Sequence, residues 1–458
     1  MNRKQLISIK KWLDKSHRKP LVVRGARQVG KSTLIDLFAQ QQHIPLTQIN
    51  LERFNNLSPA FQSNDPRAIL DVLEALPGVN TVSAASLLFL DEIQAVPEAI
   101  AALRYFYEDM PQLAVVCAGS LLEYALRDHR FSMPVGRVEY LHMGPMTFTE
   151  FLEALDETRL LATICEFTLD SEINPVVHGR LMELLRYYYF VGGMPEAVSV
   201  FATTRSLKEV GDVHNSIIQT YREDFPKYIG SRSLSRVQQV FNFAARNVGK
   251  KVKYSQYSSE DASATIKSDI ELLCLARVLS KVIHSHCSGL PLQADLEEKM
   301  YKLIFLDVGL MNAICGVNWI SISRMTESTL VNEGTIAEQF IGQHLLELLA
   351  ESPNRELNYW LREGRSNNAE LDYVIALNGR IVPIEVKAGA TGSLKSLHQF
   401  MGEKLASEAS PLAVRFDMNL PSRQTIQARI KKGEQVHDLQ YELLSLPLYL
   451  VERLPALV

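Results

Sequence analysis

The sequence contains no long apolar run. None of its apolar stretches approaches the roughly eighteen consecutive residues that predict a membrane-spanning helix. The first segment, residues 1–19, is basic and amphipathic, and it has no apolar block of the kind found in signal peptides. These absences argue against a membrane partner and lead us to expect a cytoplasmic protein.

Cysteine is also scarce, with five residues among 458. The five stand far apart, form no Cys-x-x-Cys pair and are not accompanied by histidines at zinc-type spacing. We therefore interpret them as buried or unreactive thiols and expect no structural zinc. They are Cys117, Cys165, Cys274, Cys287 and Cys315.

A strong net charge is missing as well. The value of −4 gives no general attraction for nucleic acid, so contact with DNA would need a local basic surface. Arg246, Lys250, Lys251 and Lys253 offer one such stretch, although a charge run is usually a solvated face. Apolar residues make up 47% and charged residues 22%, as in soluble globular proteins. The length of 458 residues favours several domains.

The pattern of apolar residues predicts an α/β first domain. Short apolar runs alternate with helical patterns, which favours a parallel sheet covered by helices. The predicted strands are 20–23, 46–51, 87–90 and 113–118, and the predicted helices include 2–17, 31–41, 66–76 and 98–107.

Changes in pattern along the chain divide it into four parts. We expect a nucleotide-binding core at 1–150 and a helical lid at 151–230, which Gly192-Gly193 and Pro195 interrupt. A helix and hairpin module at 231–320 follows. The last domain, at 325–458, begins with a helix at 333–349 and has predicted strands at 357–361, 371–377, 381–387 and 412–416, with a helix at 394–405.

A phosphate-binding loop follows the first predicted strand. Residues 25–32 fit the pattern GxxxxGK[ST] and lead into a predicted helix, which is the context that this motif requires. Backbone N–H groups of such a loop surround phosphate oxygens, Lys31 reaches the outer phosphates, and Ser32 binds magnesium. The predicted ATP-binding residues are Gly25, Ala26, Arg27, Gln28, Val29, Gly30, Lys31, Ser32 and Thr33.

Two acids end the predicted strand at 87–90. After a good phosphate-binding loop, a buried strand with this ending predicts a Walker B segment. Asp91 would hold Mg²⁺ and Glu92 would orient and deprotonate the attacking water.

Two further residues have alternative interpretations. Ser120 follows the strand at 113–118, where it could sense the terminal phosphate or could cap a helix. Arg137 lies in a loop beyond that strand, where it could act as an arginine finger in its own or a neighbouring subunit, or could form a surface ion pair.

The chain resembles a group of bacterial and archaeal AAA+ superfamily ATP-binding proteins that carry a C-terminal domain of unknown function. This resemblance implies an AAA-type ATPase core, a winged-helix-like module in the middle and a restriction-endonuclease-like C-terminal fold. We also expect the protein to form a homo-oligomer. The similar stretches are 24–33, 87–94, 119–120, 136–137, 192–197, 224–228, 305–310, 338–340 and 383–387.

A hairpin in the last domain sets the position of two acids. Asn378-Gly379 between two apolar runs predicts a two-residue type I′ turn, which pairs Leu377 with Arg380. Counting back along the hairpin places Asp372 opposite Glu385. Two carboxylates at such a pair repel each other and need a cation.

A metal site on this hairpin would resemble that of PD-(D/E)xK nucleases. Asp372 and Glu385 would hold Mg²⁺ or Mn²⁺, Lys387 would lie near the attacking water or phosphate, and Glu338 matches the helical acid of that family. The alternative is a solvated charged face on which Glu370 pairs with Lys387.

These features together predict an ATP-hydrolysing AAA-type protein, with ATP and Mg²⁺ as cofactors, that acts on DNA in repair, recombination or defence. A rival hypothesis is a signalling or scaffold ATPase, in which nucleotide switches assembly and the C-terminal domain binds a partner without cleavage.

Overall fold

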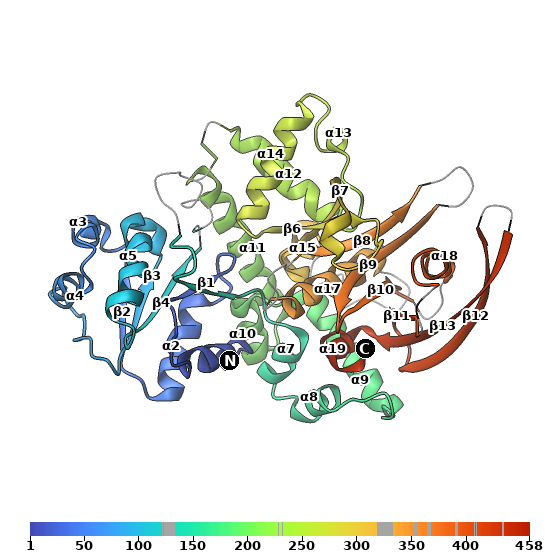
Figure 1. Ribbon diagram of the computed structural model, residues 1–458, viewed down its shortest axis with the longest axis horizontal. Coiled ribbons are helices and arrows are strands. Elements are labelled where there is room, and N and C mark those ends of the chain that lie inside the picture. Colours follow the sequence, from blue (N-terminus) through green and yellow to red (C-terminus); the bar gives the residue numbers. More distant parts are fainter. Residues whose placement is uncertain are drawn as a thin grey trace. The chain divides into compact units, whose positions relative to one another are not determined.

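The computed structural model describes residues 1–120, 122, 133–227, 229–230, 232–317, 333–350, 356–363, 368–389, 393–406, 408, 410–432 and 435–458 (Figure 1). Contacts group the chain into two compact units. The first contains residues 1–146 with 224–230 and 272–278, and the second contains 147–223, 231–271 and 279–458. No described helix combines the length and apolar character needed to cross a membrane.

The first unit is built on a parallel five-stranded sheet with the order β2-β3-β4-β1-β5. The predicted parallel sheet is therefore confirmed. Its strands are β1 (Leu21–Arg24), β2 (Leu46–Asn50), β3 (Leu87–Asp91), β4 (Ala114–Gly119) and β5 (Glu139–His142). Its helices are α1 (Gln5–Leu13), α2 (Lys31–Gln42), α3 (Ser58–Gln62), α4 (Pro66–Glu74) and α5 (Pro97–Asp109).

The strand order brings three loops to one edge. β1 lies between β4 and β5, and β3 is the other neighbour of β4. Since the strands are parallel, their carboxyl ends share one edge, where ligands bind in open α/β sheets. β3 and β4 are buried along their whole length. The sequence pattern missed β5, whose four residues include the exposed Tyr140.

The helical segment of the second unit begins at Phe148. Its helices are α7 (Phe148–Ala154), α8 (Thr158–Cys165), α9 (Pro175–Val191), α10 (Pro195–Thr204) and α11 (Leu207–Asp224). The predicted break lies between α9 and α10. Gly192 has φ 69° and ψ −165°, a backbone conformation that is essentially restricted to glycine.

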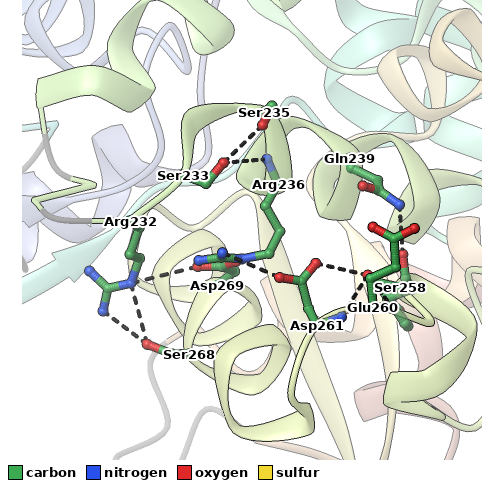
Figure 2. Close-up of polar contacts among 11 residues, drawn as sticks. Arg232, Ser233, Ser235, Arg236, Gln239, Ser258, Glu260, Asp261, Ser268 and Asp269 are labelled. Carbon is green, nitrogen blue, oxygen red and sulfur yellow. Dashed lines mark hydrogen bonds and ion pairs between the residues drawn. The ribbon is translucent and has the colours of Figure 1, made fainter.

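A second group of helices precedes a long hairpin. It consists of α12 (Leu234–Arg246), α13 (Tyr254–Tyr257) and α14 (Ser263–Leu275), followed by β6 (Leu279–Ser285) and β7 (Leu296–Phe305). Figure 2 shows how α12 is tied to α14 through Arg236, which pairs with Asp269 at 2.6 Å and with Asp261 at 3.5 Å. Asp269 is fully buried, and Arg232 also approaches it at 3.6 Å.

The second unit also contains an eight-stranded mixed sheet with the order β12-β13-β11-β10-β9-β8-β6-β7. Besides β6 and β7, its strands are β8 (Leu357–Arg362), β9 (Ala369–Leu377), β10 (Arg380–Val386), β11 (Leu412–Asp417), β12 (Ser422–Lys432) and β13 (Gln435–Pro447). The remaining helices are α15 (Val308–Ile314), α17 (Glu333–Leu348), α18 (Lys395–Lys404) and α19 (Leu454–Leu457). On one face, Leu397, Phe400 and Met401 of α18 pack with Trp360 and Leu371.

This sheet joins segments that the sequence pattern had separated. β6 pairs in parallel with β8, so the hairpin of the predicted 231–320 module belongs to the same sheet as the strands of the predicted 325–458 domain. Such a pairing is non-local, and no periodicity in the sequence specifies it. The division into four domains remains a prediction.

The turn between β9 and β10 has the predicted form. Asn378 and Gly379 have φ of 50° and 75°, as a type I′ turn requires. The observed pairs run from Leu377 with Arg380 to Tyr373 with Ile384, so the predicted register is confirmed over this part of the hairpin. The pairing of Asp372 with Glu385 remains a prediction.

Candidate nucleotide site and C-terminal acid cluster

The phosphate-binding loop connects β1 to α2. Gly30 precedes the helix with φ 91°, and Gln28 also has a positive φ of 62°. A Cβ atom on Gly25 would collide with the carbonyl oxygen of Met143, so glycine is needed there for close packing. Ala26 and Val29 are buried, whereas Thr33 is exposed on α2. The loop thus has the tight, glycine-dependent form that the motif predicts.

Lys31 lies folded against its own loop. Its Nζ donates to the carbonyl oxygens of Ala26 at 2.8 Å and Gly25 at 3.2 Å. Burial lowers the pKa of Lys31 to about 8, and the positive charges of Arg27 and Arg277 act in the same direction. Phosphate oxygens would oppose this shift, because a nearby negative charge favours the protonated amine.

The two predicted magnesium ligands are in direct contact. Ser32 Oγ donates to Asp91 Oδ2 at 2.8 Å. Asp91 ends the buried strand β3, and burial raises the pKa of its carboxyl group, while the hydrogen bond from Ser32 lowers it. A hydroxyl and a carboxylate are the oxygen ligands that Mg²⁺ takes in such sites, so the pair fits this ion.

Glu92 contacts Ser120 across the carboxyl edge of the sheet. Ser120 Oγ donates to Glu92 Oε2 at 3.2 Å, and its backbone N–H reaches the same oxygen at 3.3 Å. Gln94 Nε2 also donates to Glu92 Oε2, at 2.6 Å. Both interpretations of Ser120 remain predictions. The helix that it would otherwise cap falls on residue 121 and residues 123–132, outside the described part.

Sequence reasoning missed the partners of the loop arginine. Arg27 pairs at 2.5 Å with Asp224, a buried residue at the end of α11, and Lys227 reaches the same carboxylate at 3.0 Å. Asp224 belongs to 224–228, one of the stretches that carry the family resemblance, but the resemblance assigned it no role. Arg277 lies close enough to lower the pKa of Lys31, and no motif in the sequence predicts that it comes near this loop.

Arg137 forms a surface ion pair. Its Nε donates to Glu108 Oε1 at 2.8 Å, and its side chain is 43% exposed. Its guanidinium also lies 5.9 Å from the ring centre of Tyr107. This contact is the alternative that the sequence left open, and the finger role remains a prediction.

The predicted C-terminal residues form one cluster. Asp372 Oδ2 accepts from the backbone N–H of Val386 at 2.7 Å, and the ammonium group of Lys387 pairs with Glu385. Glu338 comes from α17 and is held near this hairpin, since Tyr373 Oη donates to its backbone carbonyl at 2.8 Å.

A lysine that the sequence did not reveal lies among these acids. Lys302, on β7, has a side chain that is only 2% exposed; it pairs with Glu338 at 3.2 Å and with Glu370. Burial alone would lower the pKa of Lys302, but the charges of Glu338, Asp372 and Glu370 outweigh burial and raise it. The predicted pairing of Glu370 with Lys387 is wrong, because each of these residues has another partner.

The acids of the cluster hold protons more tightly than usual. Burial raises the pKa of Glu338 to about 8, and burial together with the charge of Asp372 raises that of Glu385 to about 7. Glu385 Oε2 is buried and has no hydrogen-bond partner. A cation at this oxygen would remove the cost of the orphaned acceptor, so the site fits a metal at this point.

Glu338, Asp372 and Glu385 do not, however, form a closed set of three ligands. Among the described residues, the only group of three metal-type ligand atoms within 4.8 Å of one another is His284, His286 and Glu297. Lys302 instead provides a positive charge beside Glu338.

Residues 17–152 match the family model of the AAA domain. This part of the chain has the fold of an AAA-type P-loop ATPase domain. Residues 182–321 and 333–436 match two domains of unknown function, DUF8612 and DUF4143. The latter agrees with the C-terminal domain of unknown function that the resemblance implied. None of the curated proteins matches the chain.

Solved structures show a distant overall similarity. A Walker-type ATPase of Pyrococcus abyssi has a TM-score of 0.43 at 15% identity, covering 68% of this chain and 95% of that one. The ORC2 protein of Aeropyrum pernix has a TM-score of 0.33 at 11% identity, covering 68% of this chain and 91% of that one. The RuvB Holliday junction branch migration motor of Thermotoga maritima has a TM-score of 0.29 at 14% identity, covering 62% of this chain and 90% of that one.

Proposed function

We propose that the AAA-type domain hydrolyses ATP and that the C-terminal domain of this chain binds DNA and cleaves it with a nuclease-like acid cluster. The proposal treats 231–320 as a winged-helix-like module and 325–458 as a PD-(D/E)xK nuclease-like domain, in a cytoplasmic homo-oligomer. The order of α12, α13, α14 and the β6–β7 hairpin is the order of a winged helix, which supports the first assignment.

In the ATPase site, each predicted residue has a separate task. Lys31 binds the outer phosphates, and Ser32 and Asp91 would hold Mg²⁺, which neutralises phosphate charge when bound. Glu92 orients the attacking water and accepts its proton. Ser120 and Gln94 fix the direction of the Glu92 carboxylate, since both donate to its Oε2.

In the C-terminal domain, the observation that carries the proposal is the buried, unpartnered Oε2 of Glu385 beside Asp372. Asp372 and Glu385 would hold Mg²⁺ or Mn²⁺, with Glu338 nearby, and the ion would polarise a phosphodiester when bound. Lys387 carries a positive charge at the same place, where it can orient a phosphate oxygen.

A cleavage assay tests this half of the proposal. Full-length protein is incubated with Mg²⁺ or Mn²⁺ and with single-stranded, duplex and branched DNA. We expect metal-dependent cleavage of at least one form, which Glu385→Gln abolishes. Glu442→Gln is the matched control, because Glu442 makes only an exposed ion pair with Arg423 in the same domain. No cleavage of any form, or equal cleavage by Glu385→Gln, would reject the nuclease assignment.

DNA binding has its own test. Lys250 and Lys253 are exposed, whereas Lys251 pairs with Glu363 at 2.8 Å. Filter binding over a salt titration should show an affinity that falls steeply with salt. Replacing Lys250 and Lys253 with Ala should reduce the slope by about two, one per phosphate contact. An absence of binding at low salt would reject a DNA partner.

One observation favours the rival function of a nucleotide-switched scaffold that binds a partner without cleavage. Lys302 places a permanent positive charge between Glu338 and Glu370, and thereby supplies part of the neutralisation that a metal would bring. ATP-dependent assembly without DNA binding or cleavage is the result expected of that function.

A further inference from the structure

A pair of histidines and a glutamate meet on the β6–β7 hairpin, and none of the three is a residue of the nucleotide site or of the C-terminal acid cluster. His284 lies on β6, His286 follows the end of this strand, and Glu297 lies on β7. One ligand atom from each of the three side chains lies within 4.8 Å of the other two. The histidine rings are 4.8 Å apart between centres, and His286 Nε2 lies 3.9 Å from Glu297 Oε2.

The hairpin geometry explains why these residues converge. His284 and His286 are two positions apart, so in an extended chain their side chains leave the same face. Glu297 is the cross-strand partner of His284. The register of the hairpin shifts between Ile283 and His284, since Ile283 pairs with Tyr301 and His284 with Glu297.

His284 has the surroundings of a metal ligand. Its side chain is only 3% exposed, and its Nδ1 has no hydrogen-bond partner. The ring also packs against that of Tyr359, with 5.4 Å between the ring centres, and this contact restricts its orientation. A buried ring nitrogen without a partner has a free-energy cost that a bound cation removes.

A cavity adjoins the three residues. Its volume is about 340 Å³, and its lining includes His284, His286 and Glu297 together with Trp360, Arg362 and Glu403. Cys287 does not contribute a ligand, because it packs in the apolar cluster and its Sγ bonds to the carbonyl of Ser285.

We propose that His284, His286 and Glu297 bind a divalent transition-metal ion, specifically Zn²⁺. Two imidazoles and one carboxylate form a donor set that zinc accepts, and three protein ligands leave a coordination position for water on the side of the cavity. Imidazole ligands select against Mg²⁺, which requires oxygen.

Calorimetry on the metal-stripped full-length protein tests the site. ZnCl₂ is added in the presence of excess Mg²⁺, which occupies sites made of oxygen ligands. We expect about one Zn²⁺ per chain and a higher midpoint of thermal unfolding with zinc than without it. His286→Ala, a change at an exposed residue, should weaken zinc binding by at least about 10-fold and remove the stabilisation.

Matched variants distinguish this site from other ligands. His17→Ala removes an exposed histidine elsewhere and should bind zinc as the parent does. Glu297→Gln should lose binding as His286→Ala does, and Co²⁺ should give visible absorption bands in the parent that both variants lack. An unchanged zinc affinity in His286→Ala and Glu297→Gln, or no binding by the parent protein, would overturn the proposal. If His284→Ala does not fold, these two variants still decide it.

Discussion

Asp307 accepts a hydrogen bond from the backbone N–H of Gly193, with 2.6 Å between Oδ2 and N. Its other oxygen, Oδ1, accepts from Leu310 N at 3.0 Å and so caps α15. A Cβ on Gly192 would collide with this carboxylate, and a Cβ on Gly309 would lie 2.7 Å from the N atom of Gly192. Residues 192–197 and 305–310, two of the stretches that carry the family resemblance, therefore pack against each other in the second unit.

Asp307→Asn should weaken the packing of these two stretches. Both carboxylate oxygens accept hydrogen bonds from N–H groups, whereas an amide has only one accepting oxygen. We therefore expect the free energy of unfolding, measured with urea, to fall by about 1–3 kcal/mol. Asp438→Asn, an exposed residue on β13, is the control.

The same variant has a pH signature. Burial raises the pKa of Asp307 to about 6 from 3.8. Between these values the folded state binds the proton more tightly than the unfolded state, so this group makes stability fall as pH rises from 3.8 to 6. The variant should lack that contribution. An identical pH dependence in both proteins would contradict this role.

Glu92→Gln should keep ATP bound and nearly stop hydrolysis, because the amide retains the shape but cannot accept the proton of water. Ser120→Ala should slow hydrolysis less, by about 10-fold, since Glu92 keeps its hydrogen bond from Gln94. Lys31→Ala should abolish tight ATP binding, because it removes the positive charge that binds the outer phosphates. Steady-state hydrolysis and nucleotide-binding measurements check all three. Parental turnover in Glu92→Gln would assign the base to another residue.

Arg137→Ala and Glu108→Gln form a matched pair, since each breaks the same ion pair. An arginine finger predicts that Arg137→Ala slows hydrolysis with little loss of binding, while Glu108→Gln remains active. Mixing Arg137→Ala with Lys31→Ala protein should restore activity if neighbouring subunits share a site. Parental activity in Arg137→Ala would leave the residue as a surface partner of Glu108.

Lys302→Met should destabilise the second unit, because it leaves Glu338 and Glu370 without their buried positive partner; losses of this kind are about 3–5 kcal/mol. If the acid cluster binds a metal, Mn²⁺ should restore much of the midpoint of thermal unfolding, and Glu385→Gln in the same background should prevent that recovery. Lys251→Met, which breaks an exposed pair with Glu363, is the control. No recovery with Mn²⁺ would support the scaffold function.

The sequence by itself determined the features that depend on local order. The pattern at 25–32 places a phosphate loop between a strand and a helix, and β1 and α2 lie there. Asn378-Gly379 requires positive φ at two successive residues, which selects one turn type, and the turn fixes the register of β9 with β10. Steric limits on the backbone act over a few residues, so a single sequence is enough to predict them.

Only the tertiary structure decided which distant residues meet. Lys302 lies among the C-terminal acids because β7 follows β6 into the same sheet as β9 and β10, and His284 meets Glu297 because the register of the hairpin shifts beside His284. Asp224 reaches Arg27 from nearly two hundred residues along the chain. Periodicity records which face of an element is apolar, but it does not specify which element packs against that face, because the driving force of burial is non-directional.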